Sequence, residues 1–325
     1  MKKILNIFVV SFALVFSSNL FANKIGVIYD SGGKFDKSFN ELAFRTAERV
    51  KNELGWDMIE FEAANNTQIE QGMRKVADRG ATLVVAMGFA QADAVAAIAP
   101  QYPDINFVAV DVCWVDDPAG NIYQACYLEH EGSFLVGVIA AMASKTGTIG
   151  FVGGMDIPLI RKFQGGYEQG ALHANPNIKI LANMTGTTPE AWNNPTKGAE
   201  LTKAQIDGGA DVVYQAAGGT GIGVLQAAAD AGIMGIGVDT NQNWMHPGSM
   251  LTSMLKRLDL TIFEQAEKTA AGTFEPGINI LGLAQGMVGY ATEDGMVTDE
   301  MAAAADAAAA GIIDGSITVA DWSQE

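Results

Sequence analysis

The sequence predicts an α/β protein made of two Rossmann-like lobes joined by a hinge. Short apolar runs rich in β-branched residues alternate with helical patterns over residues 24–111, and the same alternation resumes over residues 148–238. Such alternation is typical of a parallel sheet that helices cover on both faces. The chain has 325 residues, which is long enough for two lobes with a core each. Two similar open lobes without an enzyme motif indicate a binding protein that closes on its ligand.

The tail of the chain returns to strands after the second repeat, and we expect these segments to cross between the lobes and to serve as the hinge. The first lobe then takes the first repeat and part of the tail. The expected boundaries are 1–22 for a signal peptide, 23–130 plus about 258–290 for the first lobe, and 131–257 plus about 291–325 for the second lobe.

The first 22 residues have the pattern of a cleavable secretory signal. Lys2 and Lys3 precede an apolar run over residues 4–16, and a cut after Ala22 is expected. The run is too short for a membrane span, and no later stretch is apolar for long enough. No cysteine lies near the expected cut. We therefore expect a periplasmic protein that is neither inserted into the membrane nor anchored by a lipid.

The chain is acidic, with 20 Lys and Arg residues against 37 Asp and Glu residues. Its formal charge is −17, and loss of Lys2 and Lys3 with the signal peptide takes it to −19. This charge disfavours nucleic acid and anionic lipid as partners, and its simplest role is solubility.

Cys113 and Cys126 are the two cysteines of the sequence, and each lies in a segment that reads as a strand. An oxidising compartment would allow them to pair. Two buried free thiols are the alternative, and the sequence leaves both open.

The elements of the first repeat follow from the spacing of apolar residues and from the turn residues between them. The helix after the first strand carries an apolar stripe and begins near Asp36 or Ser38, either of which can cap it. Strands are expected at 25–28, 57–63, 82–87, 106–111 and 122–128, and helices at 39–50, 67–79 and 90–99.

The second repeat begins after a helix of small and apolar residues at 132–143, whose composition suggests close packing. In the tail, we expect a surface helix at 300–310 and a docked end at 312–322. Strands are expected at 148–152, 179–184, 211–216, 234–238, 250–254 and 278–283, and further helices at 159–173, 195–207, 221–231 and 259–271.

The loop after the first strand is the first candidate for a ligand pocket. Asp30 ends the strand, and Phe39 and Asn40 begin the helix that follows. Open α/β sheets bind small molecules at the carboxyl ends of their strands. Asp111 ends a later strand of the same lobe, so the two carboxylates can receive hydrogen bonds from a base or act as an acid/base pair. The alternative for each Asp is a cap or a turn.

The second candidate is the glycine-rich stretch 217–224, AGGTGIGV, between a strand and a helix. Its backbone N–H groups can approach a ligand oxygen, and Asp239 follows Gly218 by 21 residues at the end of the next strand. A Rossmann unit places an acid on ribose hydroxyls at this spacing, although the GxGxxG pattern itself is not met. A carboxylate beside such N–H groups suits a vicinal diol. A tight turn with a capping Asp explains the stretch equally well.

Lys256 and three aromatic residues complete the candidate site. Lys256 is expected to point from the crossover region into the cleft, where its ammonium can bridge a ligand hydroxyl and Asp239; the alternative is a surface lysine. Phe39, Phe163 and Trp192 can stack on a planar ligand, or can belong to the core.

Several site types have no support in the sequence. His130, His173 and His246 lie far apart, so we expect no metal site. GxSxG, HExxH and P-loop patterns do not occur, and we expect no cofactor and no catalytic residues.

Taken together, the motifs resemble the basic membrane protein family of ABC-transporter substrate-binding proteins, whose best-understood members bind purine nucleosides. The matching motifs appear in the family's order and span nearly the whole mature chain. They are GGKFDKSFN after Asp30, EGSFLVG at 131–137, GFVGGMDIP at 150–158, GGTGIGV at 218–224, GVDTNQ at 237–242 and SMLKR at 253–257.

The resemblance implies the type I periplasmic-binding-protein fold and a role for each matching residue. Asp30, Asn40 and Asp111 would bind the edge of the base. Phe39 and either Phe163 or Trp192 would sandwich its ring. In the second lobe, Asp239 and Lys256 would hold the ribose, with the backbone near Gly218 assisting.

The resemblance also implies a function. The protein would capture a purine nucleoside in the periplasm and deliver it to an inner-membrane ABC permease, and we expect it to act as a monomer. Many family members are lipoproteins, whereas this sequence lacks the lipid-accepting cysteine. The alternatives are a receptor for a sugar or an autoinducer with the same fold, and a periplasmic nucleoside-cleaving enzyme in which Asp30 or Asp239 activates water.

Overall fold

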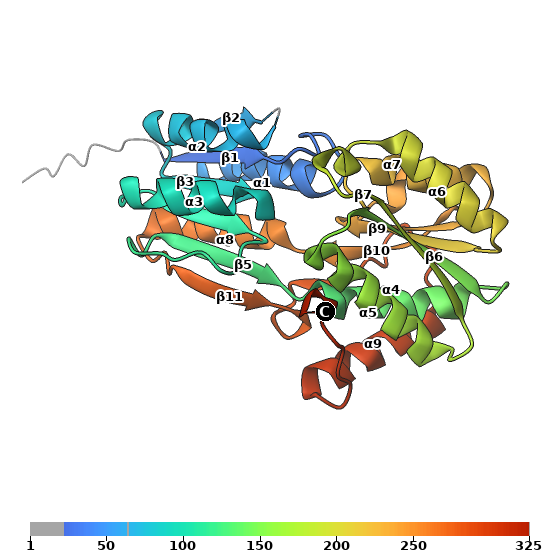
Figure 1. Ribbon diagram of the computed structural model, residues 1–325. Helices are drawn as coiled ribbons and strands as arrows, with labels where there is room; N and C mark the ends of the chain where they lie inside the picture. Colours follow the sequence, from blue (N-terminus) through green and yellow to red (C-terminus); the bar gives the residue numbers. More distant parts are fainter. Residues whose placement is uncertain (1–22, 64, 325) are drawn as a thin grey trace, which may run out of the picture.

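A computed structural model describes residues 23–63 and 65–324. The signal peptide expected over residues 1–22 lies outside the described residues. The described chain forms two six-stranded sheets, one in each lobe (Figure 1). The two-lobed α/β architecture predicted from the sequence is therefore confirmed.

The first sheet has the strand order β11-β5-β4-β3-β1-β2, and all its neighbouring strands are parallel. Its strands are β1 (Lys24–Tyr29), β2 (Asp57–Glu62), β3 (Leu83–Met87), β4 (Asn106–Val110), β5 (Ile122–Tyr127) and β11 (Gly277–Leu281).

The second sheet has the order β12-β10-β9-β8-β6-β7 and is parallel except for β12, which pairs antiparallel with β10. Its strands are β6 (Thr148–Met155), β7 (Lys179–Gly186), β8 (Val212–Ala216), β9 (Met234–Asp239), β10 (Met250–Lys256) and β12 (Val288–Tyr290).

Helices cover both faces of the first sheet, as the strand composition requires. Successive side chains of a strand point to opposite faces, so Val27 and Tyr29 pack toward α1 and α8, while Ile28 packs toward α2 and α3. Both faces are apolar, which explains why β1 reads as a continuous apolar run. The helices of this lobe are α1 (Phe39–Leu54), α2 (Ile69–Asp78), α3 (Ala92–Ile98) and α8 (Leu258–Ala271).

The second lobe is built around a close pair of helices, α4 and α5. Gly137 and Gly170 lie where a Cβ atom would collide with the backbone of the facing helix, at Tyr167 and Phe134 respectively. The small residues seen in the sequence therefore allow this approach. The helices of this lobe are α4 (Glu129–Ala143), α5 (Pro158–Ala174), α6 (Pro195–Asp207), α7 (Thr220–Asp230) and α9 (Asp299–Asp314).

Short 3₁₀ segments complete the description of the elements. They are η1 (Asn66–Gln68), η2 (Phe89–Gln91), η3 (Ala99–Gln101), η4 (Pro189–Trp192), η5 (Asn243–Met245), η6 (Leu283–Gln285) and η7 (Trp322–Gln324).

The chain passes between the lobes at three crossovers: after β5, after β10 and after β11 (Figure 1). Backbone hydrogen bonds join these segments, from Leu128 N to Leu281 O at 2.9 Å and from Arg257 N to Met287 O at 2.9 Å. β12 belongs to the second sheet, so the last crossover falls between Leu281 and Val288.

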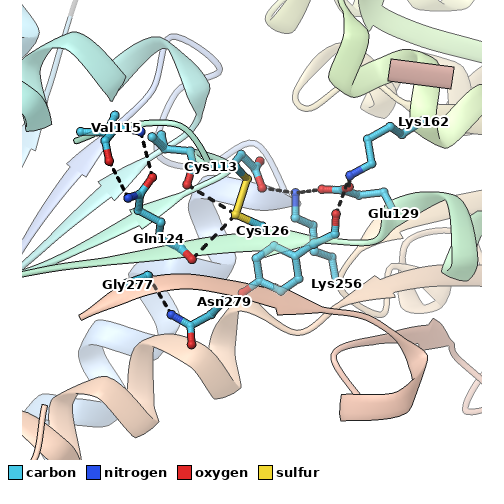
Figure 2. The surroundings of a disulfide bond; sticks show 12 residues. Cys113, Val115, Gln124, Cys126, Glu129, Lys162, Lys256, Gly277 and Asn279 are labelled. Carbon is cyan, nitrogen blue, oxygen red and sulfur yellow. Dashed lines mark hydrogen bonds and ion pairs between the residues drawn. A yellow bond between two sulfur atoms is a disulfide. The ribbon is translucent and has the colours of Figure 1, made fainter. Parts of the chain in front are cut away.

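The Cys113–Cys126 disulfide joins the loop after β4 to β5 (Figure 2). The two cysteines are 13 residues apart in sequence, and their Cα atoms are 5.7 Å apart. Of the two alternatives left open by the sequence, the structure has the disulfide. It fixes the segment that follows Asp111, a residue of the candidate site.

Replacing both cysteines should lower the stability of the protein. A disulfide that closes a loop of this length restricts the unfolded chain, and we expect Cys113→Ser/Cys126→Ser to reduce the free energy of unfolding by about 2 to 3 kcal/mol. Urea unfolding followed by circular dichroism measures this change. Wild-type protein unfolded in reductant is the control and should match the variant; equal stability of variant and oxidised wild type would contradict the prediction.

Candidate functional site

A pocket lies between the lobes, at the carboxyl ends of strands from both sheets. Its empty space is about 540 Å³ when the open mouth is included. Eight of the nine residues predicted from the sequence line it, all except Asn40. The lining residues are Asp30, Gly32, Asp36, Phe39, Gly88, Phe89, Asp111, Leu159, Ile160, Phe163, Trp192, Ala216, Ala217, Gly218, Val238, Asp239 and Lys256.

The loop after β1 holds Asp30 through Asn40. The Asn40 amide donates from Nδ2 to Asp30 Oδ1 at 2.6 Å and accepts from Asp30 N at 3.1 Å. The side chain of Asn40 is fully buried and does not reach the pocket. Asn40 was expected to touch the ligand, but its contacts are those of a residue that orients Asp30.

Asp36 caps α1, and it is one of the two capping residues that the sequence predicted. Its carboxylate accepts from the backbone N–H groups of Ser38 at 2.8 Å, Asn40 at 3.0 Å and Glu41 at 3.1 Å. These are among the N–H groups that have no partner within a helix. The cap leaves the Ser38 side chain free for another contact.

Ser38 connects the two lobes. Its hydroxyl lies 2.5 Å from Asp239 Oδ2 and 3.2 Å from Val238 O, both at the end of β9 in the second lobe. Nearby, Gln242 Nε2 donates to Lys37 O at 2.9 Å. These contacts hold the described chain in a closed arrangement around the pocket.

The Lys256 ammonium forms the floor of the pocket. Its Nζ lies 2.6 Å from Asp111 Oδ1 and 2.9 Å from Glu129 Oε1, and all three side chains are almost completely buried. The sequence led us to expect Asp239 as its partner, and the ion pairs are instead with Asp111 and Glu129. The β9–β10 register explains this, because Asp239 lies beside Leu255 and Lys256 is one residue further along.

Two aromatic rings, one from each lobe, lie near this floor. Lys256 Nζ lies 5.3 Å from the ring centre of Phe39, in the first lobe, and 5.7 Å from that of Phe163, in the second. Trp192 lines the same pocket from η4. Because rings from both lobes border the pocket, a flat ligand can be enclosed between them.

Gly218 shapes the wall between β8 and α7. Its φ of 54° lies in the left-handed region, which favours glycine. Thr220, at the start of α7, accepts from Asn194 N at 2.6 Å and donates to Ala191 O at 2.8 Å. Thr220 thereby holds the segment that carries Trp192 against the glycine-rich turn.

Burial dominates the electrostatics of the pocket acids. It raises the pKa of Asp36 to about 8 and, against the nearby Lys256, the pKa of Asp111 to about 6. Burial also raises the pKa of Asp30 and of Asp239 above the ordinary value. A ligand that donates hydrogen bonds to these carboxyl groups favours their ionised forms.

Glu129 behaves differently because two ammonium groups flank it. Burial by itself would raise its pKa, but Lys162 and Lys256 lower the pKa to about 2. Lys162 Nζ lies 2.7 Å from Glu129 Oε2. For Lys256, burial opposes the charge, but Asp111, Glu129 and Asp239 hold its pKa well above the ordinary value.

Sequence reasoning missed Glu129 as a residue of the site. It begins a helix directly after a crossover, and no motif singles it out. The signal that could have found it is its place two residues after the end of β5, a strand parallel to the one that Asp111 follows.

The described residues contain no cluster of three or more His, Cys, Asp or Glu side chains that could hold a metal ion. Within the same residues, no helix combines the length and the hydropathy that a membrane span requires.

The sequence profile of a family described as PnrA-like ABC transporter substrate-binding proteins matches residues 22–322. The chain belongs to this family. Its members bind a substrate for a transporter, and the closed pocket between two lobes agrees with that role. The resemblance read from the motifs is thus confirmed for the family.

Curated relatives cover most of the chain. Basic membrane protein A2 of Borrelia garinii subsp. bavariensis is 33% identical over 303 residues, which are 91% of this chain and 88% of that protein. The nucleoside-binding protein BmpA of a Lactococcus lactis ABC transporter is 32% identical, over 91% of this chain and 88% of that protein. A Pyrococcus furiosus relative, 33% identical over 84% of this chain and 71% of that protein, is described as an uncharacterized lipoprotein.

A solved structure has the same fold. An ABC-transporter solute-binding protein of Aeropyrum pernix superposes with a TM-score of 0.83 at 25% identity, covering 92% of this chain and 93% of that chain. The type I periplasmic-binding-protein fold that the family resemblance implied is confirmed by this similarity.

Glu129 should stabilise the fold most at neutral pH and lose its effect in acid. Its pKa falls from 4.5 to about 2 on folding, so the unfolded chain takes up the proton first as the pH decreases. The free energy of unfolding should therefore fall from pH 4.5 toward pH 2, and Glu129→Gln should make this fall less steep. Urea unfolding over this range measures both slopes, and equal slopes would contradict the prediction.

Proposed function

We propose that the protein is a periplasmic receptor for a purine nucleoside and presents the closed, loaded form to an inner-membrane ABC permease. The observation that carries the proposal is that two aromatic rings from opposite lobes, Phe39 and Phe163, line one pocket together with four carboxyl groups and one ammonium. A flat base with N–H donors, joined to a sugar with hydroxyl groups, matches both features.

The proposed roles follow the position of each group. Asp30, oriented by Asn40, binds N–H groups on the edge of the base, while Phe39 and Phe163 stack on its faces with Trp192 beside them. Asp239 and Lys256 bind the ribose hydroxyls next to Gly218. Asp111 is in contact with Lys256, so it meets the ligand close to the lysine.

Selectivity for nucleosides would come from the buried acids. A ligand that leaves one of these carboxylates without a hydrogen bond binds more weakly, because the carboxylate has lost its water without gaining a partner. This loss is larger than that of an apolar contact. The name of the Lactococcus lactis relative, a nucleoside-binding protein, supports the same ligand class here.

We propose a periplasmic protein without a lipid anchor. The support is that both cysteines of the sequence, Cys113 and Cys126, lie within the first lobe, far from the expected cut after Ala22. Incorporation of labelled palmitate in cells would contradict this part of the proposal.

Purified protein should bind purine nucleosides without converting them. Because Trp192 lines the pocket, we expect a saturable change of tryptophan fluorescence, and Trp192→Phe is the control that assigns the signal. Chromatography of the same mixtures follows the nucleoside itself. Release of free base by catalytic amounts of protein would indicate the nucleoside-cleaving enzyme, and binding of sugars alone would indicate the sugar receptor.

Asp239→Ala should weaken the binding of nucleosides far more than the binding of free bases. Loss of a hydrogen bond to a charged group corresponds to roughly a 10- to 100-fold rise in Kd. Isothermal titration calorimetry with a nucleoside and its base measures the difference. Asp230→Ala, at an exposed acid at the end of α7, is the control and should leave both affinities unchanged. Equal losses for nucleoside and base would show that the ribose assignment is wrong.

A further inference from the structure

Four charges of alternating sign run from the second lobe into the pocket, and all but the partly buried Lys162 are buried. Lys162 Nζ lies 2.7 Å from Glu129 Oε2, and Glu129 Oε1 lies 2.9 Å from Lys256 Nζ, which in turn lies 2.6 Å from Asp111 Oδ1. Figure 2 shows Glu129 between the two lysines. Asp111 and Lys256 line the pocket, whereas Glu129 lies behind them and is 1% exposed.

The middle pair of this row lies at the hinge. Glu129 is the first residue of α4, directly after the crossover at Leu128, and Lys256 is the last residue of β10, directly before the crossover at Arg257. The Glu129–Lys256 ion pair therefore joins two of the three segments that connect the lobes.

The other end of this row of charges, at Lys162, lies next to Phe163 in the sequence. Lys162 also donates to Tyr127 O at 2.6 Å, at the end of β5, and its neighbour in α5 is Phe163. Glu129 thus holds one ammonium beside the segment that carries Phe163 and one on the floor of the pocket.

We propose that Glu129 is a positioning residue for ligand binding, which holds the Lys256 ammonium at the hinge while Asp111 and Lys256 engage the ligand. This inference rests on the proposed function, since it concerns the same pocket. A lysine side chain has many rotamers, and ordering it on binding costs affinity. With Glu129 in place, Lys256 stays fixed even when Asp111 turns to the ligand.

The alternative role for Glu129 is purely structural. A buried acid between two lysines is costly to remove in any case, because it leaves the buried Lys256 and the partly buried Lys162 short of a partner. Loss of stability alone cannot separate the two roles. Energetic coupling between Glu129 and Lys256 in the affinity for the ligand does separate them.

A double-mutant cycle with Glu129→Gln and Lys256→Met tests the inference. We expect Glu129→Gln to raise the Kd for a purine nucleoside about 10-fold or more in the wild-type background. In the Lys256→Met background, where there is no ammonium to position, the same substitution should change the Kd by less than about 3-fold. Calorimetry on protein whose fold is checked by circular dichroism gives the four values.

Glu131→Gln is the matched control. Glu131 is also a hinge acid, with its Oε2 accepting from Leu283 N at 2.7 Å, but it forms no ion pair with Lys256. It should leave the Kd within about 3-fold of wild type. Should Glu129→Gln not fold, Glu129→Asp serves instead, because it keeps the charge while withdrawing the carboxylate by one methylene.

Three outcomes would overturn the inference: wild-type affinity of the Glu129 variant, equal losses in both backgrounds, or an equal loss from Glu131→Gln. Failure of the proposed function looks different, because the wild-type protein itself would then bind no nucleoside. That measurement precedes every variant.

Discussion

The buried ammonium of Lys256 is the interaction on which the rest of the site depends. A charge removed from water is costly unless carboxylates compensate it at close range. Here Asp111 comes from the end of a strand in the first sheet, and Glu129 from the helix that follows the first crossover. Because all three must meet, the floor of the pocket is fixed at the point where the lobes join.

The other polar residues complete a closed and acid-rich enclosure above this floor. Ser38 brings the start of α1 to Asp239, and Asn40 and Asp36 give the loop after β1 a fixed shape. The acids outnumber the one ammonium that lines the pocket, and burial raises the pKa of each. This excess of acceptors favours a ligand that is rich in hydrogen-bond donors.

Much of the fold could be predicted from the sequence, because strand and helix patterns are local. The positions of Asp30, Asp111 and Asp239 also followed from a general rule, since parallel strands bring their carboxyl ends to one edge. The α/β alternation repeated in the two halves of the chain then predicted that two such edges face each other across a cleft.

What the sequence could not provide was the pairing of side chains across the lobes. Asn40 reads as a ligand residue, but the turn directs its amide to Asp30 and away from the pocket. Lys256 and Asp239 end neighbouring strands, yet Lys256 reaches across to the first lobe. No sequence pattern marks Glu129. Its role depends on how the end of β10 packs against the start of α4, and no local motif encodes that packing.

The tight packing of α4 and α5 explains why Phe163 and Lys256, on two sides of the pocket, move together. Gly166, on α5, lies where a Cβ atom would collide with the backbone of His130, one residue after Glu129. The segment that carries Lys162 and Phe163 therefore cannot shift without the start of α4. Glu129 also holds Lys256. Any rotation of the second lobe about the hinge therefore moves Phe163 and the Lys256 ammonium together.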